Sequence, residues 1–211
     1  MAKRYVSNKE TTPRLFSNEL IEKLSHVHPT VPIMLFLPVI SCFLFLAFNS
    51  GTIEAGLVTL LFLAGVLFWT LMEYVIHRYV FHYHPKSELG QQIHFLAHGI
   101  HHDYPKDPMR LVMPPAISIP LALIFYGFFW VLLGSSYTAP IYSGFVFGYL
   151  AYDMIHYATH HFSMKETEMG LWLKHYHSKH HYQDEKYGFG VSSPLWDYVF
   201  RTTRPPKAEE V

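Results

Sequence analysis

Four long apolar stretches alternate with polar segments along this chain. They cover residues 31–48, 53–72, 115–133 and 141–155. A helix needs about 20 apolar residues to cross the hydrocarbon core of a bilayer, so we expect each stretch to form a membrane-spanning helix. The sequences Asn-Ser-Gly at 49–51 and Gly-Ser-Ser at 134–136 are turn signals between paired stretches. The pattern therefore predicts an all-α membrane protein with four transmembrane helices arranged as two hairpins.

The segment before the first apolar stretch is polar, which argues against a cleavable signal peptide. Within it, Leu20, Ile21, Leu24 and Val27 follow helical spacing. This spacing predicts a short amphipathic helix, either lying on the membrane surface or packed on the rest of the protein. We divide the chain into an N-terminal interfacial segment at 1–30, an integral-membrane domain at 31–203 and a flexible tail at 204–211.

The charges agree with this topology. Half of the chain is hydrophobic and 15% is charged, which is too apolar for an ordinary soluble domain. Every Lys and Arg lies in residues 1–30, 77–113 or 159–211, and none lies in the two short turns. The positive-inside rule therefore places these three segments on the cytoplasmic side of a multi-pass protein. We expect the endoplasmic reticulum membrane in a eukaryote and the inner membrane in a bacterium.

Two function classes are excluded by composition. Acidic and basic residues balance at a formal net charge of zero, so there is no basic footprint for nucleic acid. The single cysteine, Cys42, excludes an internal disulfide framework and a cysteine-based zinc or iron–sulfur site within this chain.

Ten histidines form four clusters that flank the apolar stretches. In a helix, residues three and four apart share a face, so three of the clusters each present imidazoles in one direction. Neutral imidazole is the commonest nitrogen ligand for transition metals. The clusters predict a built dinuclear metal site at a membrane surface, in preference to a low-complexity metal-binding tail. They consist of His77 and His82; His98, His101 and His102; His156 and His160; and His177, His180 and His181.

The first cluster has a different spacing. His77 and His82 are five apart, which is about 140° around an ideal α-helix. They should therefore face different metals, unless the helix ends between them. When one ring nitrogen of a histidine binds a metal, the N–H of the other nitrogen is usually donated to a carboxylate or carbonyl. Four residues near the clusters are candidates to support the ligands in this way or by packing. They are Glu73, Asp153, His94 and His161.

Ten nitrogen ligands give each of two metals about five. Zinc in proteins normally takes four ligands, whereas five-coordinate sites with an open position suit iron and oxygen chemistry. We therefore expect two iron ions, with zinc as a metal that overexpressed protein could acquire.

These motifs resemble those of the fatty acid hydroxylase / sterol desaturase superfamily of membrane di-iron enzymes, and most closely its fatty acid 2-hydroxylase branch. The resemblance runs from about residue 73 to residue 201. Its strongest parts are the stretches His-Phe-Leu-Ala-His-Gly-Ile-His-His-Asp-Tyr-Pro at 94–105 and Arg-Leu-Val-Met-Pro-Pro at 110–115. The stretches at 174–182 and 188–197 add to it. The resemblance implies that all ten clustered histidines are ligands in a cytosolic histidine-rich helical cap.

The resemblance also implies an activity, which is hydroxylation of a lipid acyl chain with O2 at the carbon next to the carbonyl, in a fatty acid or ceramide. Many members of this branch carry a cytochrome b5-like domain, which the sequence at hand does not contain. Electrons are then expected from a separate donor of the cytochrome b5 or ferredoxin type. Tyr104, Lys106 and Arg110 are candidates to hold the polar end of the lipid, and the alternative is a basic loop that touches lipid phosphates.

Two other functions are compatible with the histidines. A lipid or sterol desaturase or oxidase would use the same metal centre, because ligand spacing does not distinguish hydroxylation from loss of a second hydrogen. A metal transporter would instead place its ligands inside the spans, where only His156 and Asp153 approach such a depth.

Overall fold

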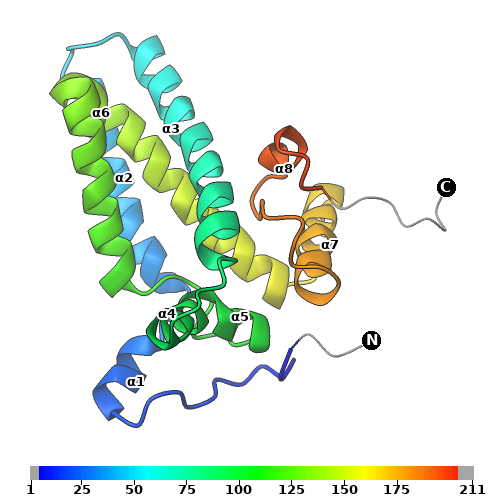
Figure 1. Ribbon diagram of the computed structural model, residues 1–211. Helices are drawn as coiled ribbons and strands as arrows, with labels where there is room; N and C mark the ends of the chain where they lie inside the picture. Colours follow the sequence, from blue (N-terminus) through cyan, green and yellow to red (C-terminus); the bar gives the residue numbers. More distant parts are fainter. Residues whose placement is uncertain (1–4, 204–211) are drawn as a thin grey trace. The chain divides into compact units, whose positions relative to one another are not determined.

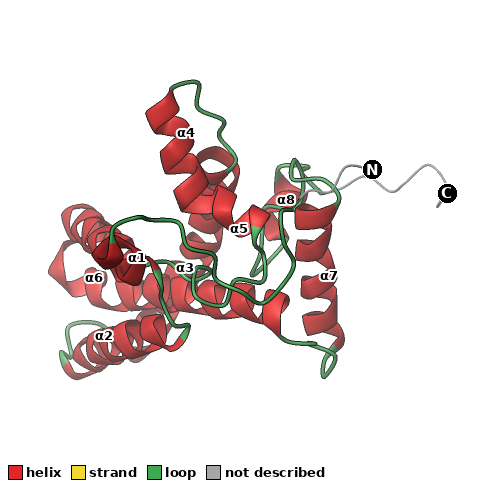
Figure 2. Ribbon diagram, turned by 90° about the horizontal axis from the view of Figure 1, so that it is seen from below, coloured by secondary structure: helices red, strands yellow, loops and turns green. Residues whose placement is uncertain are grey.

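Every regular element between residues 5 and 203, the part that the computed structural model describes, is a helix (Figure 2). In chain order the helices are α1 (Glu19–Ser25), α2 (Thr30–Asn49), α3 (Ala55–Ile76), η1 (His77–Phe81), α4 (Glu88–His94), η2 (Phe95–Gly99), α5 (Ile100–Asp103), α6 (Pro115–His161), α7 (Glu168–Tyr182) and α8 (Leu195–Val199). The elements η1 and η2 are π-helical.

These helices belong to two compact units. The histidine unit contains the described residues of 1–10, 71–107 and 158–211, and the helical unit contains 11–70 and 108–157. The chain crosses from one unit to the other four times, after residues 10 and 107 in loops, after residue 70 inside α3 and after residue 157 inside α6. Most of the clustered histidines therefore fall in the histidine unit, while the long apolar runs fall mainly in the helical unit.

Three described helices are long and apolar enough to cross a membrane. They are α2, α3 continued through η1 to Phe81, and the 47-residue α6. The sequence predicted four separate helices. The last two expected helices, at 115–133 and 141–155, are both parts of α6, and the second extends to His161.

Helix α6 folds back on itself at Gly134, whose φ of 73° and ψ of 175° are nearly exclusive to glycine. Phe125 and Phe145 would lie about 30 Å apart in a straight helix, at 1.5 Å per residue. Their ring centroids are instead 4.5 Å apart. The two halves of α6 thus form a hairpin, as the green and yellow-green segments in Figure 1 show, with its bend at the predicted Gly-Ser-Ser turn.

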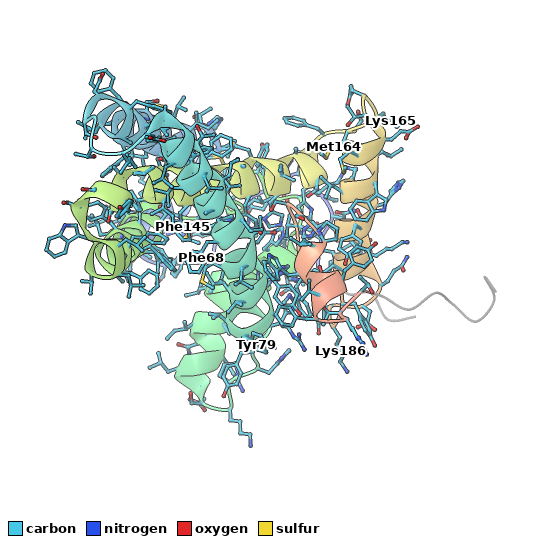
Figure 3. All side chains as sticks on the ribbon, turned by 90° about the horizontal axis from the view of Figure 1, so that it is seen from above. Phe68, Tyr79, Phe145, Met164, Lys165 and Lys186 are labelled. Atoms are coloured by element: carbon cyan, nitrogen blue, oxygen red, sulfur yellow. The ribbon has the colours of Figure 1, made fainter. Side chains whose placement is uncertain are left out.

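Glycines let α3 and the second half of α6 approach closely. A Cβ atom on Gly65 would lie 2.0 Å from the Ile141 carbonyl oxygen, and one on Gly144 would lie 1.9 Å from the Phe62 carbonyl oxygen. Small residues at membrane helix interfaces permit this backbone contact. Beside it, the rings of Phe68 and Phe145 are 5.9 Å apart (Figure 3).

Helix α1 turns its polar side towards the protein. Glu22 is only 8% exposed, whereas Leu20 and Leu24 are 66% and 67% exposed. The Glu22 carboxylate accepts hydrogen bonds from the backbone N–H groups of Leu15 and Phe16. Packing on the protein therefore uses the acidic residue and leaves the apolar face of α1 uncovered among the described residues.

The buried partner of Glu22 is Arg110. Its guanidinium lies 2.6 Å from the Glu22 carboxylate and donates further hydrogen bonds to the Ser25 hydroxyl and the Pro13 carbonyl. Arg110 was expected from the sequence to hold the polar end of a lipid. These contacts instead commit its charge to the N-terminal segment, because a buried carboxylate requires a compensating partner.

The pH dependence of stability tests this ion pair. Burial of the Glu22 carboxyl favours its neutral form, but the backbone N–H donors and Arg110 outweigh burial and lower its pKa to about 2. In the unfolded chain the pKa is about 4.3. The pair therefore stabilises the fold fully above about pH 4.3 and loses this contribution as the pH falls towards 2.

Replacing Glu22 by glutamine should lower the thermal unfolding midpoint in detergent at pH 7, and the gap to the original protein should narrow below pH 4. Glu19→Gln is the matched control, because Glu19 forms an exposed ion pair with Arg14 that contributes little. A gap that stays constant down to pH 2 would contradict the assignment.

Candidate metal centre

Five histidines of the histidine unit form a first group, in which one ring nitrogen of each lies within 4.8 Å of the others. The Nε2 atom of His77 is 3.2 Å from those of His82 and His98. The Nε2 atoms of His98 and His102 are 3.0 Å apart, and those of His82 and His180 are also 3.0 Å apart. The five rings thus aim their Nε2 atoms at a common point.

A second group of five has the same property. The Nε2 atom of His177 lies 2.9 Å from that of His160 and 3.0 Å from that of His181. The ring of His101 lies 4.7 Å from that of His160. His156 joins the group from one turn earlier on α6 than His160. Lys174 of α7 donates to the carbonyls of Thr159 and Phe162, which fixes α7 against the end of α6.

The two groups are built alike. Each takes two histidines from each of two helical segments and one from a third, and the single member is always the middle histidine of an H-x-x-H-H motif. His101 leaves its own motif for the second group, and His180 leaves its own for the first. The H-x-x-H-H spacing therefore serves both groups at once, because residues three and four apart point in slightly different directions around a helix.

A π-helix resolves the unusual spacing of His77 and His82. Between them η1 replaces the α-helical ladder, and the His82 N–H donates to the His77 carbonyl five residues back. Residues five apart then lie on one face. The two rings therefore belong to one group, and the alternative that they face different metals is wrong. The other alternative, that the helix ends between them, fits the structure, because η1 ends at Phe81.

The spacing of the nitrogens fits a metal with more than four ligands. A central ion with metal–nitrogen bonds of about 2.1 Å separates ligands at right angles by about 3.0 Å, whereas tetrahedral ligands lie about 3.4 Å apart. Four Nε2 pairs of the first group and two of the second lie 2.9–3.2 Å apart, and the ligand atoms of each group all lie within 4.8 Å of one another. These six distances are compatible with ligands at right angles, as in a site with more than four ligands.

Two rings of the first group have their tautomer fixed by backbone carbonyls. His77 Nδ1 lies 2.5 Å from the Phe189 carbonyl, and His180 Nδ1 lies 2.8 Å from the Tyr187 carbonyl. A carbonyl oxygen only accepts, so each Nδ1 carries the proton and each Nε2 presents a lone pair. Both rings therefore present an unprotonated nitrogen to the centre of the group, which is the form that binds a cation.

Burial keeps the rings neutral. Burial, followed by the influence of neighbouring histidines, holds the pKa values of His98, His102 and His181 well below the usual range. Burial also lowers the pKa of His180 to about 4, although its bond to the Tyr187 carbonyl opposes the shift. Neutral imidazole is the form that binds metal, so the groups are ready to bind at neutral pH.

The two groups are neighbours. The rings of His102, from the first group, and His181, from the second, stack with centroids 4.2 Å apart. Phe81 stacks on His98 at 4.8 Å, and the buried Phe189 ring lies 5.6–5.9 Å from those of His77, His82 and His180. The first group is thus bordered by aromatic rings that exclude water.

Glu73 does not contact His77 as the spacing of four residues suggested. Its buried carboxylate accepts hydrogen bonds from the N–H groups of Val191 and Ser192 and from the Ser192 hydroxyl. These residues follow Phe189, whose carbonyl binds His77. Glu73 is therefore linked to His77 only through this loop.

Asp153 is also buried. In the helical unit its carboxylate lies beside the Tyr149 hydroxyl and the Met113 backbone. A direct bond from Asp153 to the His156 ring is not among its described contacts, so its expected role in orienting a ligand stays a prediction.

The other expected residues lie outside the two groups. The His94 ring packs against His84 with centroids 5.4 Å apart, and His161 follows the ligand-like His160 at the end of α6. Tyr104 and Lys106 lie half-buried in the turn after α5. Their proposed contact with a lipid head stays a prediction.

Sequence reasoning missed Asp197, which is fully buried and accepts hydrogen bonds from the Phe189 and Gly190 N–H groups. It also missed the carbonyls of Tyr187 and Phe189, because every residue has a backbone carbonyl and residue type does not indicate which one accepts a hydrogen bond. The two glycines at 188 and 190 were the available signal, since closely spaced glycines mark an unusual backbone path.

Comparisons with known proteins agree with this geometry. The sequence model of the fatty acid hydroxylase family matches residues 62–202. The chain is 38% identical over 204 residues to dihydroceramide fatty acyl 2-hydroxylase FAH2 of Arabidopsis thaliana, covering 93% of this chain and 82% of that protein. It is 43% identical over 150 residues to fatty acid 2-hydroxylase of Mus musculus.

That match covers 70% of this chain but only 40% of the mouse protein. Among solved structures, the visible hydroxylase domain of full-length scs7p matches with a TM-score of 0.85 and 38% identity, covering 92% of this chain and 73% of that chain. The family match spans both histidine groups and most of the two long helices that lead into them. The chain belongs to the fatty acid hydroxylase family.

Proposed function

We propose that the chain is a membrane-bound monooxygenase that hydroxylates a lipid acyl chain with O2 at the carbon next to the carbonyl. One observation carries the proposal, which is the convergence of ten histidines into two adjacent groups of five. The family match supports an oxidation of this kind, and the names of relatives point to fatty acyl 2-hydroxylation.

Each group would hold one iron ion. Zinc would bind the same nitrogen donors in overexpressed protein that is purified without added iron. Bound iron would supply the oxygen and redox chemistry that an unactivated C–H bond requires. Overall, one oxygen atom enters the lipid and the other leaves as water, with two electrons and two protons from a separate donor of the cytochrome b5 or ferredoxin type.

The protein's own part is ligation, orientation and exclusion of water. The ten imidazoles hold the metals, and the backbone carbonyls of Tyr187 and Phe189 keep two of the rings in the correct tautomer. Phe81 and Phe189 shield the first group from water, which limits side reactions of the activated oxygen with water. Tyr104 and Lys106 are proposed to hold the carbonyl end of the lipid.

In the membrane, we propose four spans, with the hairpin of α6 supplying two of them and the histidine-rich segments on the cytoplasmic side. The uncovered leucines of α1 support an interfacial position for this helix, because an exposed apolar face beside a spanning helix favours the bilayer surface. The membrane would be the endoplasmic reticulum in a eukaryote and the inner membrane in a bacterium.

Expression in a host that lacks acyl hydroxylation tests the activity. Cells grown under labelled O2 should accumulate acyl lipids that have gained one labelled oxygen, located at carbon 2 by fragmentation. Loss of two hydrogens without oxygen would instead indicate a desaturase. Metal uptake without any new lipid would indicate a transporter, and either result would overturn the proposal.

A further inference from the structure

We propose that the loop of residues 187–192 aims two ligands of the first histidine group, and that Asp197 and Glu73 act on the metal site through this loop. The inference rests on the proposed function, because it assumes that the group holds a metal. It assigns positioning roles to two buried carboxylates that touch none of the ligand rings directly in their described contacts.

The loop presents four consecutive N–H groups to the two carboxylates. Asp197 accepts from Phe189 at 3.0 Å and from Gly190 at 2.7 Å, one bond to each oxygen. Glu73 Oε1 accepts from Val191 at 2.6 Å and from Ser192 at 2.8 Å. Hydrogen bonds to carboxylates are stronger than neutral ones, so this stretch of backbone is held firmly.

Peptide planarity carries this constraint to the ligands. The Phe189 carbonyl and the Gly190 N–H belong to one planar trans peptide and point in opposite directions. When Asp197 fixes the N–H on one side, the carbonyl on the other side is fixed towards His77 Nδ1. Rotating this peptide would break both hydrogen bonds together.

The next ligand is aimed in the same way. The Gly188 N–H donates to the Thr202 carbonyl at 3.0 Å, while the Tyr187 carbonyl of the same peptide accepts from His180 Nδ1. Thr202 in turn donates its backbone N–H to the Asp197 carbonyl and its hydroxyl to the Asp197 carboxylate. Asp197 therefore anchors both peptides that orient the first group.

Asp197 is itself held by a directed chain of hydrogen bonds. The Thr202 hydroxyl donates to Asp197 at 2.7 Å, so it accepts from the Tyr74 hydroxyl at 3.0 Å. Tyr74 in turn accepts from the Arg78 guanidinium at 2.6 Å. This series of hydrogen bonds begins at the Arg78 guanidinium, which only donates, and ends at the Asp197 carboxylate, which only accepts. The direction of each hydrogen bond between them is therefore fixed.

The loop also depends on its glycines. Gly188 has a φ of +73°, which side chains rarely adopt. A Cβ atom on Gly190 would lie 2.0 Å from the Ser193 carbonyl oxygen and 3.0 Å from Asp197 Oδ2. Gly190→Ala therefore displaces the loop without removing either carboxylate, which gives a second and independent way to disturb the same peptides.

The predicted effect is confined to one metal. His77 and His180 belong to the first group, whereas His181 Nδ1 of the second group is buried with no hydrogen-bond partner in the part of the chain that the structure describes. A residue that merely stabilised the fold would weaken both sites together. A positioning residue should weaken the first group alone.

Chelator titration of the iron-loaded protein tests this, with metal per chain measured by mass spectrometry. Asp197→Asn and Gly190→Ala should each lower the affinity for one of the two metal ions by roughly 10–100-fold and leave the affinity for the other unchanged. This is the usual loss of metal affinity when a residue that hydrogen-bonds to a ligand is replaced. Asp184→Asn is the matched control, because its carboxylate accepts from Lys186 N–H before the loop and should leave both metals at their original affinity.

Ligand variants identify which metal is affected. On a His181→Ala background the metal of the first group remains, and Asp197→Asn should release it more easily. On a His180→Ala background the metal of the second group remains, and Asp197→Asn should change nothing. Equal weakening of both metals, or no weakening, overturns the inference, whereas an unmutated protein that binds no metal overturns the proposed function itself.

Discussion

Replacing His177 by alanine is expected to lower formation of hydroxylated lipid by more than 100-fold. His177 is almost fully buried, and its Nε2 atom lies within 3.0 Å of the corresponding atoms of His160 and His181. Replacing a residue that hydrogen-bonds to a metal ligand already lowers metal affinity or activity by roughly 10–100-fold, and removal of a ligand should lower activity more. Product is measured by mass spectrometry of lipids from expressing cells, at matched protein levels.

His175→Ala is the control for this experiment. His175 lies two residues earlier on the same helix α7, but it is exposed and belongs to neither group. Its replacement should leave product formation within about twofold of the original level. If both variants lose activity equally, or both keep it, the geometry of the second group does not explain the function.

Replacing Gly144 by alanine is expected to destabilise the helical unit strongly. The added Cβ would lie 1.9 Å from the Phe62 carbonyl oxygen and 2.9 Å from the Phe62 Cα atom. Both are backbone atoms, so relief requires the helices α3 and α6 to separate. Overpacking against rigid backbone should reach the upper end of the usual range, about 3 kcal/mol, which corresponds to a fall of on the order of 10 °C in the unfolding midpoint.

Gly127→Ala provides the comparison within the same helix. A Cβ atom there meets nothing within 4 Å, and alanine favours a helix over glycine by up to about 1 kcal/mol. The unfolding midpoint of this variant in detergent should therefore be unchanged or slightly higher. A Gly144→Ala protein as stable as Gly127→Ala would show that the close backbone contact is not present.

The apolar stretches were sufficient to predict the helical character of the fold, and the histidine spacing was sufficient to predict which ten histidines gather in space. Residues three and four apart on a helix must share a face, so local spacing carries this information. The bend at Gly134 was also visible, because Gly-Ser-Ser interrupts an apolar run.

The division of the ten histidines between two groups was not predictable. It depends on η1, where one extra residue per turn brings His77 and His82 to the same face, and on the exchange of His101 and His180 between groups. Both depend on tertiary packing. A π-helix forms only where surrounding contacts stabilise it, so the five-residue spacing alone left two alternatives.

The polar partners were the least predictable part. Sequence separation suggested that Glu73 binds His77, but 118 residues separate it from its actual partner Val191. The sequence suggested that Arg110 contacts a lipid, whereas its guanidinium binds the Glu22 carboxylate, 88 residues away along the chain. Long-range pairs of this kind are set by folding, and spacing along the chain does not encode them.

X-ray absorption at the iron edge of anaerobically loaded protein tests the central claim most directly. Two groups of five imidazoles predict a first shell of about five nitrogen atoms per iron at about 2.1 Å, with the multiple scattering of imidazole rings and no sulfur. A shell with only one or two imidazoles per iron, or iron bound mainly by oxygen, would contradict the account.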